Sequence, residues 1–163
     1  MIYRDTESDY KNYERPGSPA VANIKMGAYM VIPKNMFDIN VVSHEISHTV
    51  LYRKIGWCRL YFKIPTWFDE GLARQVDGRD YYSMDTLLNK KKGGLILPDV
   101  TQMDTPVKFH KGSAEQIMLN YSTAKYMVHE WLIKNSLDAF IEAINKGYSF
   151  EKSYNMKLFE NDL

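Results

Sequence analysis

Apolar residues recur at helical spacing through most of the chain after residue 40. The clearest stripe joins Ile117, Tyr121, Ala124, Val128 and Trp131, which follow one another at steps of four, three, four and three residues. Steps of this size keep side chains on one face of an α-helix, which has about 3.6 residues per turn. The pattern therefore predicts a long helix with one buried face.

Polar residues and glycines mark the ends of the other predicted helices. Asn40 is a suitable N-cap for a helix that runs to about Lys54, and Gly56 follows as a stop signal. Thr66 and Asp69 resemble a capping box that begins the next helix. Helices are predicted in this way over Asn40–Lys54, Thr66–Gly78, Met84–Leu88, Ser136–Gly147 and from Ser149 onward.

The first forty residues carry strand signals instead. Val21–Met26 and Ala28–Pro33 are short extended segments on either side of a glycine. We therefore predict an α+β fold in a single domain, residues 1–163, with a strand-rich part over 1–40 and a mainly helical part over 41–163. In this prediction a small mixed sheet packs on the helix that follows it.

Composition narrows the class of protein. Apolar residues make up 45% of the 163 residues and charged residues 25%, the balance of a soluble globular domain. The formal net charge is +1, which gives no reason to expect nucleic acid or an anionic membrane as a partner. No apolar run is long enough to span a bilayer, and the opening residues lack the pattern of a secretory signal. We expect a cytoplasmic protein, unless the chain is a piece of a longer one.

Cys58 is the sole cysteine. An internal disulfide and a four-cysteine zinc site are therefore both excluded. No catalytic partner for a thiolate is identifiable, so Cys58 is interpreted as a packed residue.

The strongest chemical signal is the run His44-Glu45-Ile46-Ser47-His48. On a helix the two histidines lie on one face, one turn apart, so both imidazoles can reach one metal ion. Glu45 points away from the two ligands, but its flexible carboxylate can reach a water molecule on that ion. The run therefore predicts a metal site with a general base beside it.

A catalytic zinc site needs a third protein ligand and an open position. Glu70 is the candidate, because Pro65 and Thr66 start a second helix and an antiparallel return brings Glu70 towards the ion. Gly71 beside it permits close approach of the two helices.

Residues 44–48, taken with residues 67–73, resemble the paired signature of gluzincin metallopeptidases, the group that includes thermolysin and the zinc aminopeptidases. The resemblance implies a zincin-like fold, one zinc ion held by His44, His48 and Glu70, and hydrolysis of a peptide or protein substrate with Glu45 as general base. Gluzincins commonly add a tyrosine or histidine that stabilises the oxyanion. Tyr121 is the candidate for that contact.

Several roles stay open at this point. Tyr121 is equally well explained as a core aromatic, and His110 is a weaker candidate for the oxyanion contact. Tyr81 and Tyr82 are further aromatic residues for the cleft, and His129 is interpreted as a surface residue.

The surroundings of the zinc ligands are also open. Asp69 is interpreted as the capping partner of Thr66, and Arg74 has three possible partners: Asp69, Asp77 or a substrate carboxylate. By the resemblance, Ala28–Pro33 is an edge strand that adds the substrate as another strand, although an ordinary core strand explains it as well.

Two other functions compete with peptide hydrolysis. One is a catalytically inactive zinc-binding domain with an interaction or regulatory role, and the other is hydrolysis of a non-peptide amide or ester. The residues after Tyr154 are a candidate for a segment that covers the cleft. The sequence predicts neither the substrate nor the oligomeric state.

Overall fold

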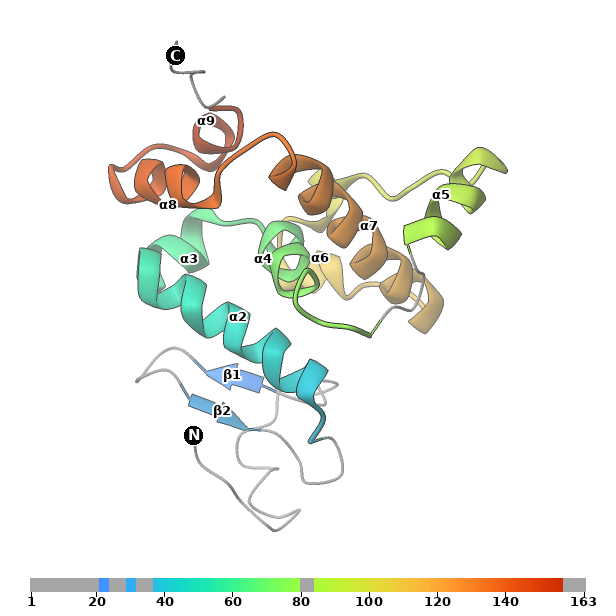
Figure 1. Cartoon of the computed structure of the whole chain (residues 1–163), viewed down its shortest axis with the longest axis horizontal. Coiled ribbons are helices and arrows are strands. Elements are labelled where there is room, and N and C mark those ends of the chain that lie inside the picture. Colours follow the sequence, from blue (N-terminus) through green and yellow to red (C-terminus); the bar gives the residue numbers. More distant parts are fainter. Residues whose placement is uncertain (1–20, 24–28, 32–36, 80–83, 157–163) are drawn as a thin grey trace.

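The structure is a computed structural model that describes residues 21–23, 29–31, 37–79 and 84–156. Most of these residues are helical, as Figure 1 shows. In chain order the elements are β1 (Val21–Asn23), β2 (Tyr29–Val31), α2 (Ile39–Ile55), α3 (Trp57–Lys63), α4 (Thr66–Ala73), α5 (Met84–Lys92), η2 (Val100–Met103), α6 (Pro106–Phe109), α7 (Ala114–Leu132), α8 (Leu137–Asn145) and α9 (Phe150–Tyr154).

Helix α2 begins two residues earlier than predicted, because its N-cap is Asp38 and its first residue is Ile39. The side chain of Asp38 caps it by accepting a hydrogen bond from the backbone N–H of Asn40, at 2.7 Å. Gly56 ends the helix with a φ of 80°, a left-handed conformation that favours glycine, and its N–H donates to the carbonyl oxygen of Tyr52. The predicted stop at Gly56 is confirmed, and the N-cap is Asp38 rather than Asn40.

Helix α4 is shorter than predicted. It starts after Pro65, and it ends at Ala73 rather than near Gly78. The chain leaves the helix through a tight turn, because the N–H groups of Gln75 and Val76 donate to carbonyl oxygens only three residues back. This early end lets the residues that follow α4 return towards α2.

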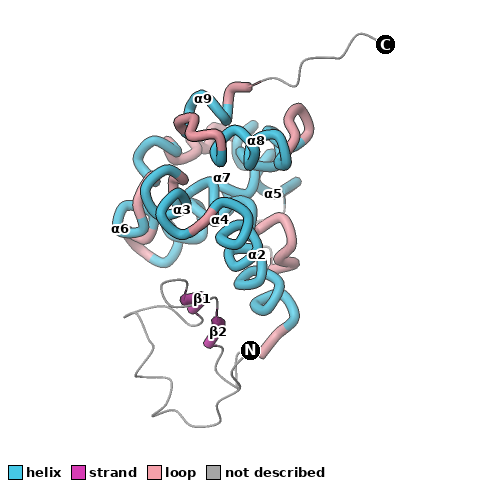
Figure 2. The backbone as a smooth tube through the Cα atoms, turned by 90° about the vertical axis from the view of Figure 1, so that its left-hand side faces the viewer, coloured by secondary structure: helices cyan, strands magenta, loops and turns pink. Residues whose placement is uncertain are grey.

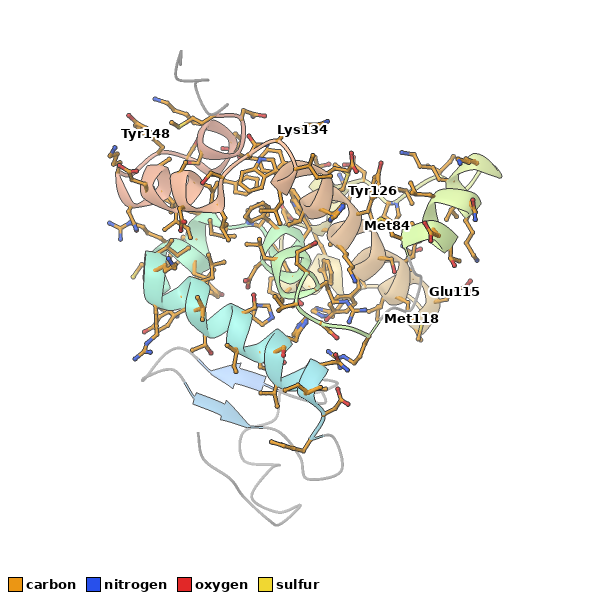
Figure 3. The ribbon with its side chains drawn as sticks, in the orientation of Figure 1. Met84, Glu115, Met118, Tyr126, Lys134 and Tyr148 are labelled. Carbon is orange, nitrogen blue, oxygen red and sulfur yellow. The ribbon has the colours of Figure 1, made fainter. Side chains whose placement is uncertain are left out.

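The later helices follow the predicted signals. Ser136 and Ser149 cap α8 and α9 through hydrogen bonds to backbone N–H groups. The predicted buried face of α7 is confirmed for Ala124, Val128 and Trp131, which are all buried. Its outer side is exposed at residues such as Glu115 and Met118 (Figure 3).

The long connection before α7 contains more helix than predicted. It forms α5, η2 and α6 in place of one short helix over Met84–Leu88. Helix α5 lies against α7, where Lys91 Nζ lies 5.1 Å from the centroid of the Tyr126 ring. The buried side chain of α5 is Leu87.

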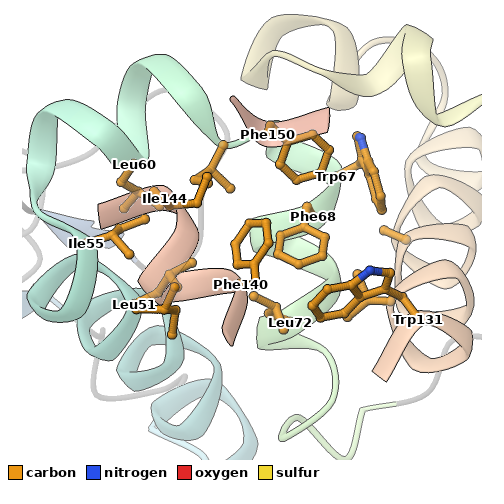
Figure 4. Close-up of a cluster of buried hydrophobic side chains, with 14 of the residues drawn as sticks. Leu51, Ile55, Leu60, Trp67, Phe68, Leu72, Trp131, Phe140, Ile144 and Phe150 are labelled. Atoms are coloured by element: carbon orange, nitrogen blue, oxygen red, sulfur yellow. The ribbon is translucent and has the colours of Figure 1, made fainter. Parts of the chain in front are cut away.

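The core is rich in aromatic rings and lies mainly among α2, α4, α7, α8 and α9, with further side chains from α3, η2 and α6 (Figure 4). Phe68 of α4 is completely buried, and its ring centroid lies 5.4 Å from that of Trp131, 4.9 Å from that of Phe140 and 5.3 Å from that of Phe150. Edge-to-face contacts of this kind add stability beyond the buried area. Helix α4 is thus fixed at the centre of the helical body.

The α+β prediction is wrong. Among the described residues the only strands are β1 and β2, an antiparallel pair of three residues each, and they form no mixed sheet. Figure 2 shows this pair beside the helical body, with β1 against α2. The extended segments of the N-terminal part pair only with each other over the described residues, and the apolar residues of the core lie on helices.

Candidate metal centre

Helices α2 and α4 bring three metal-binding side chains together. His44 and His48 lie one turn apart on α2, and their Nε2 atoms are 3.2 Å from each other. Glu70 reaches them from α4, with Oε2 3.3 Å from Nε2 of His44 and 3.7 Å from Nε2 of His48. Within the described part of the chain, these are the three residues grouped closely enough to hold a metal ion.

The distances among these donor atoms fit a tetrahedral cation. Donor atoms at about 2.0–2.1 Å from a tetrahedral zinc ion lie about 3.3–3.4 Å from one another. The three donor atoms here lie 3.2, 3.3 and 3.7 Å apart. Oε2 of Glu70 is buried and has no hydrogen-bond partner within the described residues. Because a buried carboxylate oxygen without a partner is costly, a bound cation gives this atom a partner.

Each histidine is supported by a carboxylate behind it. Nδ1 of His48 lies 3.0 Å from Oδ1 of Asp69, and Nδ1 of His44 lies 3.3 Å from Oδ2 of Asp77. For His48 this contact is a hydrogen bond, and for His44 it is a contact at ion-pair distance. In both rings the other nitrogen, Nε2, faces Glu70. This arrangement orients the imidazole and raises its basicity in zinc proteins.

The interpretation of Asp69 as a helix cap is wrong. The N-cap of α4 is Pro65, and no side chain caps this helix, so Thr66 and Asp69 form no capping box. Asp69 instead directs its carboxylate at His48 across the gap between α4 and α2. The position of Asp69, three residues after Thr66, is compatible with a cap and with a contact to a metal ligand on another helix. The packing of α4 on α2 determines that Asp69 contacts His48.

Asp77 is itself held by two arginines. Nη1 of Arg74 donates to Oδ2 of Asp77 at 2.6 Å, and Arg79 donates to both carboxylate oxygens at 2.9 and 2.6 Å. Arg74 is 2% exposed and also donates to the carbonyl oxygen of Arg79. Of the three partners considered for Arg74, the structure gives Asp77. These contacts fix the carboxylate that supports His44.

Gly71 allows α4 to sit close to its neighbour, and that neighbour is α7. A Cβ atom at this position would lie 2.6 Å from the carbonyl oxygen of Ala124 and 2.6 Å from Cγ2 of Val128. Both distances are far below normal contact, so only glycine fits here. The expected close approach at Gly71 exists, but the neighbouring helix there is α7 rather than α2.

The carboxylates of the site and the two histidines shift one another's pKa values. Burial lowers the pKa of His48, but the nearby charge and hydrogen bond of Asp69 outweigh it and raise the pKa to about 10. Burial raises the pKa of Glu70, but the close contact with His44 and the positive charges of both histidines lower it to about 2. For Asp77, burial is outweighed by His44 and Arg79, which hold its pKa well below the usual range. Without a metal, protons on the imidazoles balance these carboxylates.

Glu45 lies on α2 between the two histidines and is 8% exposed. Its negative charge is among the groups that raise the pKa of His48. A carboxylate in this position can exchange a proton with a ligand on the open side of a cation held there.

Tyr121 and His110 form a pair beside the three donors. The Tyr121 hydroxyl lies 3.1 Å from Nε2 of His110, and the centroid of its ring lies 6.5 Å from that of His44. Nδ1 of His110 lies 2.9 Å from the carbonyl oxygen of Pro106, which can only accept, so Nδ1 carries a proton and Nε2 of the neutral ring accepts from Tyr121. The two candidates for the oxyanion contact are therefore hydrogen-bonded to each other.

The remaining candidates lie away from this centre or outside the described residues. His129 is exposed on α7, as expected for a surface residue. Cys58 is exposed rather than packed, so that interpretation is wrong. Tyr81 and Tyr82 lie outside the described residues, as does the segment after residue 156. Of Ala28–Pro33, the described residues 29–31 form β2, which pairs with β1.

Comparison of the chain with known protein families, with curated protein sequences and with solved structures finds no match. The resemblance to gluzincins thus depends on the two short motifs and on the geometry around them.

Proposed function

We propose that this chain is a zinc-dependent peptidase of the gluzincin type. The observation that carries the proposal is the convergence of His44, His48 and Glu70 on one point at zinc-bond distances, with Glu45 on the same helix as the two histidines. A structural zinc site has no need of an extra carboxylate at that position, whereas a hydrolytic site needs a base there.

The residues would divide the work as follows. A zinc ion held by His44, His48 and Glu70 would act as a Lewis acid and would lower the pKa of a bound water molecule to about 7. Glu45 takes the proton of the attacking water and then gives it to the leaving amine. Asp69 and Asp77 keep the two imidazoles oriented, so the ligand set does not have to rearrange during the reaction.

The Tyr121 hydroxyl would supply the second contact for the oxyanion, beside the Lewis acid. A donor aimed at the developing negative charge is commonly worth a factor of about a hundred or more in rate. In the described structure this hydroxyl is directed at His110, so it must turn from that partner to the substrate oxygen. His110 would hold the hydroxyl in reach until substrate arrives.

The substitution Glu45→Gln tests the proposal. This change keeps the size of the side chain and removes the base, so we expect zinc binding to be retained and cleavage of a peptide library to fall by about a thousandfold. Glu115→Gln, at an exposed glutamate of α7, is the matched control and should cleave at the parent rate.

Two results would contradict the proposal. Cleavage by Glu45→Gln at the parent rate would remove Glu45 as the base. Tight zinc binding by the parent chain, without turnover of any peptide or small acyl substrate, would favour the inactive zinc-binding domain.

A further inference from the structure

Helix α3 carries an exposed group of aromatic rings, which we call the aromatic surface: Trp57, Tyr61 and Phe62. Tyr61 is 62% exposed and Phe62 is 73% exposed. Trp57 stacks on Tyr61 with ring centroids 6.0 Å apart, and Phe62 lies edge-on to both rings at 6.3 and 5.0 Å. The buried residue of α3 is Leu60, so these rings gather outside the core. Scattered exposed apolar residues are ordinary, but a gathered group marks an interaction surface.

The chain around the aromatic surface carries positive charge. Between residues 46 and 68 the sequence has no Asp or Glu and four cationic residues: Arg53, Lys54, Arg59 and Lys63. Lys54 lies 3.5 Å from Asp138 of α8, and Nζ of Lys63 donates to the carbonyl oxygen of Gly147 at 2.9 Å. Within the described residues one carboxylate therefore meets these four cations at ion-pair distance. The formal net charge of the whole chain is only +1, because acidic residues elsewhere in the sequence offset this local excess of positive charge.

We propose that α3 binds the surface of an anionic lipid membrane. Trp and Tyr rings favour the level of the lipid headgroups, where one edge of the ring is apolar and the other is wet. Lysines and arginines beside such rings are attracted to anionic headgroups. Here the apolar rings lie on α3, and the cations lie on α3 and at the end of α2. Such a combination is the chemistry of a segment that lies on a membrane.

The contact is peripheral. No helix within the described ranges is both long enough and apolar enough to cross a bilayer. Helix α3 has seven residues, so it adds a small contact area, and binding should be reversible and sensitive to salt. This proposal differs from the prediction from net charge that no membrane takes part, and the vesicle experiment below distinguishes the two.

Membrane binding would place the metal centre near the lipid surface. His48 and Ile55 are seven residues apart on α2, which corresponds to about 10 Å along the helix axis, and α3 begins directly after Gly56. The inference does not depend on the proposed function, because vesicle binding needs neither zinc nor hydrolysis. Glu45→Gln should bind vesicles as the parent chain does.

Sedimentation with lipid vesicles tests the inference. The full chain is mixed with vesicles of phosphatidylcholine alone or of phosphatidylcholine with phosphatidylserine. We expect binding to the anionic vesicles, weaker binding to the neutral ones, and a loss of at least about tenfold in partitioning for the double variant Tyr61→Ser/Phe62→Ser. The matched control is Ile96→Ser/Val107→Ser, at residues 89% and 82% exposed, which should bind as the parent does.

Tryptophan fluorescence gives a second readout at α3. Trp67 and Trp131 are buried at 5% and 6% exposure, whereas Trp57 is partly exposed. Contact with anionic vesicles should therefore shift the emission to shorter wavelength through Trp57, and Trp57→Phe should abolish the shift.

Four results would overturn the inference. They are no binding of the parent chain to anionic vesicles, equal binding to neutral vesicles, full binding by Tyr61→Ser/Phe62→Ser, and an equal loss in the control variant. A dimer that forms without lipid and is abolished by Tyr61→Ser/Phe62→Ser would assign the surface to a second copy of the chain.

Discussion

Oδ2 of Asp77 lies 3.3 Å from Nδ1 of His44, on the edge of the imidazole opposite the Nε2 atom that faces Glu70. Asp77 follows α4 and is anchored by Arg74 and Arg79. The turn after α4 therefore positions a carboxylate beside His44, which we propose as a zinc ligand.

Asp77→Asn should weaken zinc binding by about ten- to a hundredfold. An amide at this position supports the imidazole less well than a carboxylate does, and it also weakens the contacts with the two arginines. A competition assay with a zinc chelator measures the affinity. Asp138→Asn, at an aspartate whose side chain is 87% exposed, is the control and should bind zinc normally. Equal affinity in the two variants would contradict the role of Asp77.

Asp69→Asn separates a role behind His48 from a role as a helix cap. We expect zinc affinity to fall by about tenfold while the metal-free protein keeps its melting temperature within a few degrees. A lost cap would do the reverse, lowering stability by about 1 kcal/mol and leaving zinc affinity unchanged. Thermal unfolding and zinc titration of the same variant distinguish the two.

Zinc binding should release protons at neutral pH. The pKa of His48 is raised to about 10, so its imidazole carries a proton at pH 7 that a bound metal must displace. Calorimetry in two buffers of different ionisation enthalpy measures the number of protons released, and we expect at least about one. Zinc binding without proton release at pH 7 would contradict this charge state.

The same proton affects the stability of the metal-free protein. Because the pKa of His48 rises from 6.5 to about 10 on folding, its contribution to stability is complete below about pH 6.5 and is lost as the pH rises towards 10. Unfolding by urea across this range, in the presence of a chelator, should show the loss.

Gly71→Ala should destabilise the fold by about 1–3 kcal/mol, because the added methyl group meets the backbone of Ala124. Gly93→Ala is the matched control: its Cβ atom would lie 3.4 Å from the carbonyl oxygen of Lys90, an ordinary contact. Chemical unfolding of both variants checks the prediction. An unchanged midpoint for Gly71→Ala would mean that α4 and α7 pack less closely than described.

Tyr121→Phe should leave zinc content unchanged and lower kcat by about a hundredfold. The variant keeps the ring that packs beside Phe109 and loses only the hydroxyl. Tyr148→Phe, at a residue 37% exposed, is the control and should keep full activity. If Tyr121→Phe hydrolyses peptides at the parent rate, the residue is a core aromatic and nothing more.

The three donors could be predicted from the sequence: the two histidines depend on local spacing alone, and Glu70 belongs to the second of two motifs that resemble the gluzincin signature. His44 and His48 share a helix face, and Glu70 follows a helix start marked by Pro65. The buried face of α7, which includes Val128, could also be predicted, because apolar residues on one helix face repeat with the helical period.

The supporting carboxylates could not be predicted in the same way. Asp69 and Asp77 meet the histidines only through the packing of α4 on α2 and through the early end of α4 at Ala73. One local signal for Asp77 was available, namely an arginine one turn before it. The prediction of the fold class was wrong for a related reason. A strand pattern such as that of Val21–Met26 indicates that a segment can be extended, but it does not indicate how many other strands will pair with it.

The most direct measurement is a crystal structure of the zinc-loaded protein, with the metal located by its anomalous scattering. We expect one zinc ion about 2.0–2.2 Å from Nε2 of His44, Nε2 of His48 and a carboxylate oxygen of Glu70, with a fourth position open to solvent. A zinc ion bound elsewhere, or Glu70 directed away from the two imidazoles, would contradict the account.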